Sequence, residues 1–167
     1  MKTVFLAALI AGFLLMGTNP IQSQTTDDKL NQMELLKQWQ GTWKCEIGKD
    51  TIDIQYVNLF GKAMIDSIIT VSKGKILAHE MEIWGYDQTH DKIIAAGIGE
   101  TSPAIYLYAA WFTSKDTMTI VQYQYISSPE KANFKIEWVI KSPDLITRTV
   151  FANGKALDVK TYNRVKK

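Results

Sequence analysis

The sequence predicts an all-β protein, an antiparallel up-and-down β-barrel of about ten strands with a short N-terminal helix closing one end. Three observations predict it. From residue 41 onward, polar and apolar residues alternate with period two, as in strands that bury one face. The runs are joined by turns too short for crossover helices, so neighbouring strands pair antiparallel. Closure removes the two unpaired edges of so long a sheet. A two-sheet sandwich is the alternative that the same pattern leaves open.

The N-terminal segment has the layout of a secretory signal peptide. Lys2 gives a positive start, residues 4–16 form an apolar run, and residues 17–24 are small and polar. The apolar run is shorter than the roughly 20 residues that a membrane-spanning helix needs. We therefore expect residues 1–23 to be a cleaved signal peptide, with cleavage after Gly17 as the alternative, and residues 24–167 to form one barrel domain. The mature protein is expected to be secreted or periplasmic, without a membrane span.

Residues 25–40 are expected to form an amphipathic helix. Thr26 or Asp27 can accept hydrogen bonds from the first free N–H groups of that helix. Its apolar residues recur at helical spacing and make one stripe: Leu30, Met33, Leu36 and Trp39. Such a stripe must be buried, so we expect the helix to lie over the closed end of the barrel.

Ten strands are expected after this helix. Their approximate bounds are 41–47, 51–59, 62–72, 75–86, 92–99, 104–112, 117–126, 132–141, 145–152 and 155–165. The sharpest turn is Asn153-Gly154, because Asn-Gly between two strands favours a tight type I′ hairpin. No second helical region, linker or repeat interrupts the series, so one domain is expected.

Composition and motifs exclude several functions. The 19 basic and 17 acidic residues nearly balance, and no basic run with interleaved aromatic residues suggests nucleic-acid binding. The two histidines have no nearby thiols or spaced carboxylates, so no zinc site is expected. Signatures of nucleophilic hydrolases, phosphate loops and dinucleotide sites are absent. A single cysteine, Cys45, makes no internal disulfide and is expected to be a small buried apolar residue.

Alternation divides most strands into two faces, and we expect the more apolar face to point inward. In strand 132–141, Phe134 and Trp138 oppose Lys135 and Glu137. In strand 75–86 the apolar face carries a histidine, and Glu80 and Glu82 are expected to face outward with Glu137. The predicted ligand-binding residues are Tyr56, Ile65, His79, Met81, Ile83, Leu107, Trp111, Phe134, Trp138 and Arg148.

Two polar residues on apolar rows are candidates for ligand recognition. His79 can hydrogen-bond the polar end of a ligand or coordinate haem iron. The alternative is a histidine satisfied by a neighbouring hydroxyl or carbonyl group. Arg148 can pair with a ligand carboxylate, or it can lie at the barrel mouth with its head in water. Haem aside, no cofactor or metal is expected.

Strands 104–112 and 117–126 carry apolar or aromatic residues on both faces. Four tyrosines lie in this region: Tyr106, Tyr108, Tyr123 and Tyr125. They either pair across strands, line a ligand site, or present a surface to a partner.

Gly41-Thr42-Trp43, directly after the expected helix, resembles the Gly-x-Trp signature of the lipocalin/calycin superfamily. Trp84-Gly85-Tyr86-Asp87 and Tyr162-Asn163-Arg164-Val165 are similar to features of bacterial secreted lipocalin-like domains of unknown function. The resemblance implies that Trp43 packs at the closed end under a basic residue of the last strand, here Arg164. The chain departs from lipocalins in lacking disulfide cysteines and in its ten strands, which are closer to fatty-acid-binding proteins or nitrobindin-like barrels. The ligand class therefore stays open.

Three functions are compatible with these features. The first is an exported protein that binds a small hydrophobic or amphipathic molecule inside the barrel. The second is a protein-interaction barrel that uses an aromatic outer face. The third is a calycin-type enzyme acting on a small carbonyl or phenolic substrate, which requires the tyrosines, His79 and Arg148 to converge on one cavity. The first is preferred, with a small apolar ligand as partner and a monomer or weak homodimer as the expected state.

Overall fold

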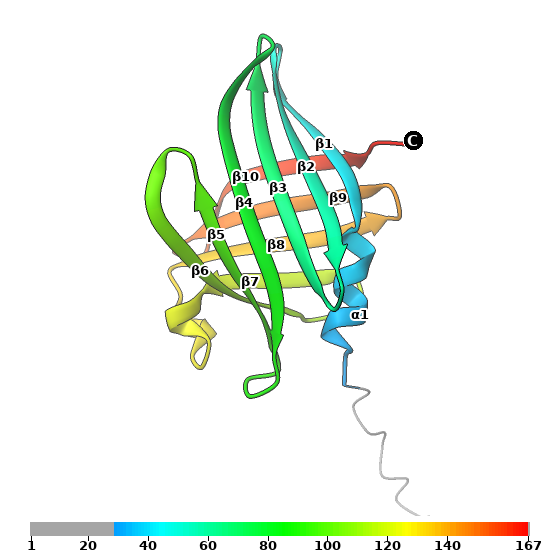
Figure 1. The fold of residues 1–167 in the computed structure, drawn as a ribbon. Coiled ribbons are helices and arrows are strands. Elements are labelled where there is room, and N and C mark those ends of the chain that lie inside the picture. The colour runs from blue at the N-terminus through cyan, green and yellow to red at the C-terminus, as the bar shows by residue number, and fades with distance from the viewer. Residues whose placement is uncertain (1–28, 167) are drawn as a thin grey trace, which may run out of the picture.

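The computed structural model describes residues 29–166, which form a barrel of ten antiparallel strands with one short helix at the N-terminal end (Figure 1). The predicted fold class is confirmed. The predicted signal peptide, residues 1–23, lies outside the described residues, as do the proposed helix caps Thr26 and Asp27.

The strands follow the predicted bounds closely. They are β1 (Gly41–Gly48), β2 (Thr51–Phe60), β3 (Ala63–Ser72), β4 (Lys75–Asp87), β5 (Lys92–Gly99), β6 (Ser102–Phe112), β7 (Thr117–Gln122), β8 (Phe134–Ser142), β9 (Leu145–Ala152) and β10 (Lys155–Arg164). Each strand pairs with its neighbour in sequence, and β1 pairs with β10 to close the barrel. The Asn153-Gly154 turn has positive φ at both residues, 50° and 75°, as a type I′ hairpin requires.

Strand β7 is shorter than predicted. The expected strand 117–126 ends at Gln122 and continues as a 3-10 turn, η2 (Tyr123–Tyr125), before a second turn, η3 (Pro129–Lys131). The pairing of β6 with β7 stops at Tyr108↔Gln122, and that of β7 with β8 stops at Val121↔Lys135. Beyond these positions the chain has no strand partner, so alternation alone does not keep it extended.

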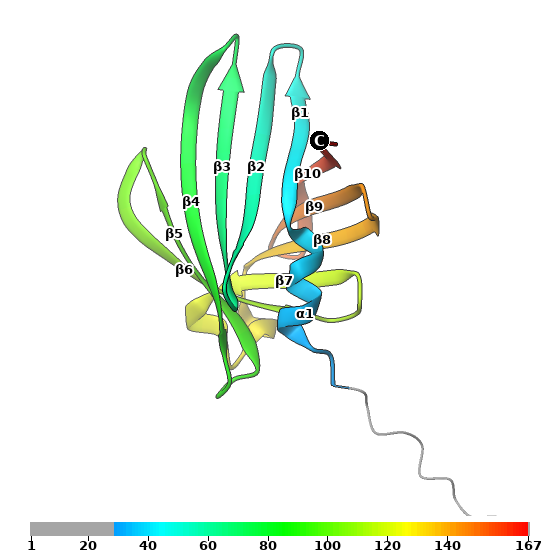
Figure 2. The same ribbon diagram turned by 45° about the vertical axis from the view of Figure 1, so that its right-hand side comes forward.

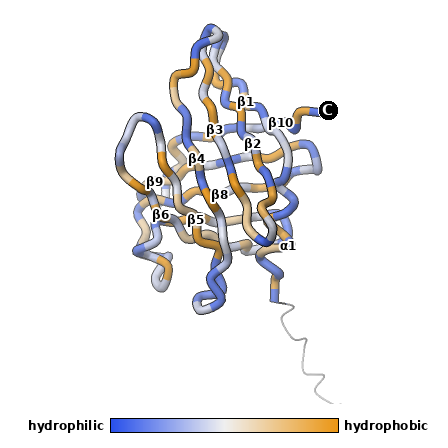
Figure 3. The backbone as a smooth tube through the Cα atoms, viewed as in Figure 1, coloured by the Kyte–Doolittle hydropathy of each residue, from blue (hydrophilic) through white to orange (hydrophobic). Residues whose placement is uncertain are grey.

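The strands cross in two directions. Figures 1 and 2 show strands β1–β4 rising beyond the rest of the barrel, while β7–β10 run across them. Hydrophilic and hydrophobic residues alternate along the strands (Figure 3). The outer face of β4–β6 is also apolar, with exposed side chains at Ile83, Ile98 and Ile105. Strands in this part of the barrel therefore carry apolar residues on the side opposite the interior.

The helical segment is shorter than the expected helix over 25–40. Within the described residues it consists of α1 (Gln32–Leu36) and a 3-10 turn, η1 (Lys37–Trp39). Asn31 caps α1, because its side-chain oxygen accepts a hydrogen bond from Glu34 N at 3.2 Å. The segment lies at the closed end, with Leu36 and Trp39 buried in the core.

Gln32 fixes the helix to the sheet. Its amide oxygen accepts from Phe112 N at 2.6 Å, and its Nε2 donates to Phe112 O at 3.4 Å. One side chain thereby satisfies both backbone groups at the end of β6. Trp39 continues this contact, with its ring centroid 5.5 Å from that of Phe112.

Trp43 seals this end of the barrel. Its side chain is 1% exposed, and its indole N–H donates to Trp39 O at 2.8 Å. The Arg164 guanidinium lies over the ring, 4.0 Å from the centroid. Cys45, two residues further along β1, is also buried.

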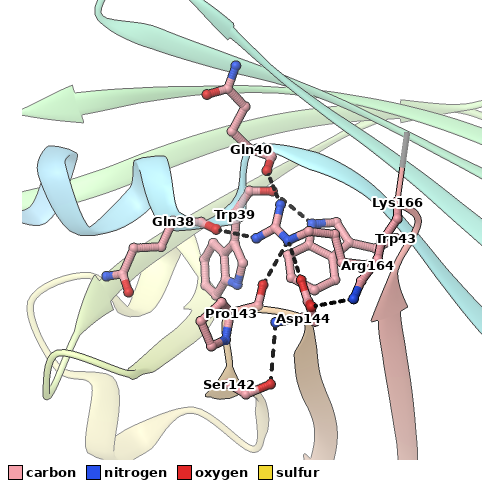
Figure 4. Close-up of polar contacts among 9 residues, drawn as sticks. All are labelled: Gln38, Trp39, Gln40, Trp43, Ser142, Pro143, Asp144, Arg164 and Lys166. Atoms are coloured by element: carbon pink, nitrogen blue, oxygen red, sulfur yellow. Dashed lines mark hydrogen bonds and ion pairs between the residues drawn. The ribbon is translucent and has the colours of Figure 1, made fainter.

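Arg164 joins three separate segments at this point (Figure 4). It donates to Gln38 O at 3.0 Å and to Gln40 O in the chain that leads into β1. It also donates to Pro143 O at 2.7 Å, in the turn between β8 and β9. Asp144 in the same turn lies 3.7 Å from Arg164 Nε. The seam between β1 and β10 has only two register pairs, so these bonds reinforce a short junction.

Gly41 makes this arrangement sterically possible. Its φ of +138° lies in a region that residues with a side chain rarely adopt. A Cβ at this position would also overlap Arg164 Nη1. The glycine is therefore required both for the bend and for the arginine above it.

We expect Arg164→Ala to lower the free energy of unfolding by about 2 to 4 kcal/mol, because it removes a stacked cation and several charged hydrogen bonds. Arg164→Lys is expected to recover only part of this, since an ammonium lacks the planar fork. Urea denaturation followed by circular dichroism measures the change. Lys166→Ala is the matched control: its side chain is 81% exposed, and its removal should change stability by at most about 0.5 kcal/mol. Equal stability of Arg164→Ala and the wild type would contradict the assigned role.

Candidate functional site: the barrel interior

The barrel interior contains a cavity of about 330 Å³ that is partly open to solvent. It lies between β2–β4 on one side and β7–β10 on the other, with Trp39 of η1 among its lining residues. Its two sides differ in chemistry, because the inward positions of β2–β4 are largely polar and those of β7 and β8 are apolar.

The apolar wall is built mainly from β7 and β8. The side chains that line it are Met118, Ile120, Phe134, Ile136 and Trp138. The Trp138 ring lies 5.9 Å from that of Trp39 and 5.4 Å from that of Tyr162, measured between centroids. These tilted aromatic contacts fix the shape of the wall and offer ring faces to a ligand.

The polar wall follows from the register of β2, β3 and β4. Asp66 of β3 stands directly opposite Glu82 of β4, and residues opposite each other in a sheet share a face. Alternation then places every second residue of these strands inside the barrel. The polar residues brought to the cavity by this register are Asp53, Gln55, Asp66, Thr70, Glu80 and Glu82.

The carboxylate of Asp53 has hydrogen-bond partners on two other strands. It accepts hydrogen bonds from Lys160 Nζ at 2.7 Å and from Thr70 Oγ1 at 2.7 Å. Tyr162 OH adds a longer bond of 3.4 Å. Burial and the charge of Asp53 raise the pKa of Tyr162, which holds its hydroxyl proton as a donor. This group ties β2, β3 and β10 together across the interior.

Asp66 and Gln55 form a second, incomplete pair. Gln55 Nε2 donates to Asp66 Oδ2 at 2.5 Å. Asp66 is 1% exposed, and burial, with the nearby Glu82 charge, raises its pKa to about 8. Within residues 29–166, neither Asp66 Oδ1 nor Gln55 Oε1 has a hydrogen-bond partner. Buried polar atoms are normally paired, so two unpaired side-chain oxygens at one place are exceptional.

Glu82 lies beside this pair. Burial raises its pKa to about 7, the Glu80 charge adds to this rise, and Trp84 and Arg148 oppose it. Gly97 of β5 leaves room for it, since a Cβ there would lie 3.1 Å from Glu82 Cγ. The Glu82 side chain therefore packs against the backbone of Gly97, which has no side chain.

Two indole N–H groups at the cavity are also without a well-formed hydrogen bond. Neither Trp39 Nε1 nor Trp84 Nε1 has a partner in the described part of the chain. Trp84 nevertheless lies near enough to Glu82 to lower the pKa of that carboxyl. The contact between them is a weak one, because hydrogen bonds lose strength steeply with poor alignment.

The two basic side chains at the cavity pair with acids other than Asp66 and Glu82. Lys160 is bound to Asp53, as described above. Arg148 Nη1 lies 3.6 Å from Asp158 on the neighbouring strand. Burial, followed by the charges of Glu82 and Glu80, raises the pKa of Tyr108, which also lines the cavity.

The structure brings three of the predicted ligand-binding residues to the cavity: Phe134, Trp138 and Arg148. The others lie on the opposite face of their strands from the cavity-lining residues. They are Tyr56, Ile65, His79, Met81, Ile83, Leu107 and Trp111.

The prediction that Glu80 and Glu82 face outward is wrong, because both line the cavity. In β2–β4 the more apolar face is the outer one. The assumption that the more apolar face points inward therefore assigned the two faces of these strands the wrong way round. Trp84 could have indicated which face of β4 points inward. It shares a face with both glutamates, and its buried ring marks that face as internal.

His79 is held by a neighbouring hydroxyl group, with Nε2 at 2.9 Å from Ser67 Oγ. Trp111 stacks under Lys92, whose Nζ lies 4.3 Å from the ring centroid. Of the residues required to converge for catalysis, only Tyr108 and Arg148 line the cavity.

Two further features limit the kind of site. Residues 29–166 contain no helix with the length and apolar character to cross a membrane. Across the same residues, His, Cys, Asp and Glu side chains form no group of three that could hold a metal ion.

The raised carboxyl pKa values predict that stability falls as pH rises from about 5 to about 8. Over this range the folded protein still holds protons on Asp66 and Glu82 that the unfolded chain has released. Each such proton contributes a slope of up to about 1.4 kcal/mol per pH unit. Asp66→Asn should reduce the slope by up to that amount and raise stability near pH 8.

Urea denaturation at several pH values measures this slope. Asp50→Asn, at an exposed turn position, is the matched control and should leave the slope unchanged. An unchanged slope in Asp66→Asn would show that Asp66 is ionised in the folded protein at neutral pH.

No model of a known protein family matches the chain, and a search of curated proteins finds no significant relative. The lipocalin/calycin resemblance therefore stays an expectation carried by the Gly41-Thr42-Trp43 motif and the residues quoted with it. Function must be inferred from the chemistry of the cavity itself.

Proposed function

We propose that this protein binds a small amphipathic molecule in the interior of its barrel. The observation that carries the proposal is a cavity of about 330 Å³ lined by an aromatic and aliphatic wall and by polar residues. Two of these, Asp66 and Gln55, have buried side-chain oxygens that find no partner among residues 29–166. Small-molecule sites have volumes of about 300 to 1,000 Å³ and combine apolar walls with a few placed polar groups. The cavity lies at the lower end of that range, which favours a small ligand.

Both sides of the cavity support binding energetically. The wall around Phe134, Ile136 and Trp138 can bury the apolar body of a ligand, at about 25 cal/mol per Å² removed from water. An unsatisfied buried polar atom costs about 1 to 3 kcal/mol. A ligand that pairs with Asp66 and Gln55 would recover part of that cost, so these two residues favour an occupied cavity.

The remaining parts of the proposal rest on the sequence. The signal-peptide layout of residues 1–23 supports binding outside the cytoplasm. The scattered placement of His79 and three of the four tyrosines gives a catalytic role no comparable support. Binding without chemistry is therefore the function that the interior favours.

A cavity-filling substitution tests the proposal. We expect the wild type to enhance the fluorescence of N-phenyl-1-naphthylamine, an uncharged probe that becomes bright in apolar surroundings. Ile136→Trp places an indole into the cavity and should raise the dissociation constant at least tenfold, about 1.4 kcal/mol.

Ile98→Trp is the matched control, because Ile98 is 55% exposed on the outer face of β5. It should leave the dissociation constant unchanged. Circular dichroism melting checks that both variants fold. Equal binding by the wild type and Ile136→Trp would place the probe outside the barrel and reject the proposal.

A further inference from the structure

We propose that the ligand is a small organic cation, whose ammonium group lies between Asp66, Gln55 and Glu82 while its apolar body rests on the aromatic wall. This inference rests on the proposed function and names the chemical class of the molecule bound. It is carried by the free acceptor atoms, by the charge balance of the cavity, and by the aromatic rings around it.

When Asp66 is ionised, the free polar atoms of the Asp66–Gln55 pair are both acceptors. Asp66 Oδ1 and Gln55 Oε1 are buried and lack partners among the residues described, and both side chains line the cavity. The amide presents Nε2 to Asp66, as a carboxylate oxygen requires. A ligand that satisfies the two oxygens must therefore supply hydrogen-bond donors. An ammonium group has three donors and no acceptor.

The balance of acidic and basic groups in the cavity also favours a cationic ligand. Its lining has four carboxyl groups, Asp53, Asp66, Glu80 and Glu82, and two bases, Arg148 and Lys160. Lys160 is bound to Asp53 at 2.7 Å, and Arg148 has Asp158 at 3.6 Å.

No base of the described chain lies within ion-pair distance, 4.0 Å, of Asp66 or Glu82. These two carboxyls stand directly opposite each other on β3 and β4. Like charges so placed repel, and a bound cation between them removes the repulsion.

The aromatic residues suit a cation with an apolar body. Trp84 lies two residues after Glu82 on β4, and the register of β4, β5 and β6 aligns it with Tyr108 across Ala95. Both aromatic residues line the cavity. The negative faces of such rings attract ammonium groups, worth about 0.5 to 2 kcal/mol. Trp39 and Trp138 then offer apolar surface to the remainder of the ligand. A bare metal ion would not use that surface, and the described chain groups no three metal-binding side chains.

Binding of a cation must compete with protons at the same carboxyls. Without a cation between them, Asp66 and Glu82 hold protons up to a pKa of about 8 and about 7, respectively. The other titratable groups that face them are Asp53 on β2, Glu80 on β4, Tyr108 on β6, Arg148 on β9, and Lys160 and Tyr162 on β10. An alkylammonium keeps its charge to about pH 10, as lysine does. Affinity for a cation is therefore expected to rise with pH up to about 8.

Isothermal titration calorimetry with three matched probes tests the inference. Phenethylamine is a cation, 2-phenylethanol is neutral and phenylacetate is an anion, and all share one apolar body. Near pH 8 we expect phenethylamine to bind at least tenfold more tightly than 2-phenylethanol, and phenylacetate to bind most weakly. Between about pH 6 and about pH 8 the affinity for phenethylamine should rise at least tenfold, while that for 2-phenylethanol stays constant.

Two variants locate the ammonium site. Asp66→Asn should weaken the preference for phenethylamine at least tenfold and reduce its pH dependence to the part that Glu82 contributes, while 2-phenylethanol still binds. Glu82→Gln provides a second test should Asp66→Asn fail to fold, and Asp50→Asn is the exposed control. Folding of each variant is checked by thermal melting.

The outcomes separate the two proposals. Equal affinity for the amine and the alcohol overturns the cation inference and leaves the binding function standing. The cation inference also fails if N-phenyl-1-naphthylamine binds inside the barrel and phenethylamine does not, or if both variants keep the amine preference. If neither N-phenyl-1-naphthylamine nor any of the three probes binds, the binding function itself is rejected.

Discussion

The stacking of Arg164 on Trp43 holds the barrel together at its weakest junction. Strands β1 and β10 share only two register pairs, so the ladder alone gives little pairing there. The guanidinium bonds carbonyl groups from the helical segment and from the turn between β8 and β9. With the seam closed, Trp43 is fixed inside. Gln55, directly opposite it on β2, must then share its face.

That constraint extends around the sheet. Gln55 inside places Asp53 inside on the same strand, and the pairing of β3 with β4 adds Asp66 and Glu82. The acidic wall is therefore a consequence of register. Ionised carboxyls are expensive to bury, and the raised pKa values of Asp66 and Glu82 reflect this. Proteins tolerate such groups mainly where function requires them.

Strand number and order were predictable because the signals are local. Turn residues such as Asn153-Gly154 and period-two alternation depend only on near neighbours in the chain. The inward face was predictable only where the two faces differ clearly. Phe134 and Trp138 oppose the charged residues Lys135 and Glu137, so the prediction placed β8 the right way round. On β4, the apolar residues Met81 and Ile83 made the outer face look internal. Alternation defines two faces, and choosing between them requires the register of the whole sheet.

The burial of the single cysteine, Cys45, limits the thiol chemistry of the folded protein. Cys45 is buried beside Trp43 on β1, and burial raises the pKa of its thiol. Thiolates, not thiols, react with oxidants and other disulfides, and a reacting partner must reach the sulfur. The folded chain therefore presents almost no reactive thiolate to its surroundings. Covalent cross-linking between molecules would first require the strand ladder around Cys45 to open.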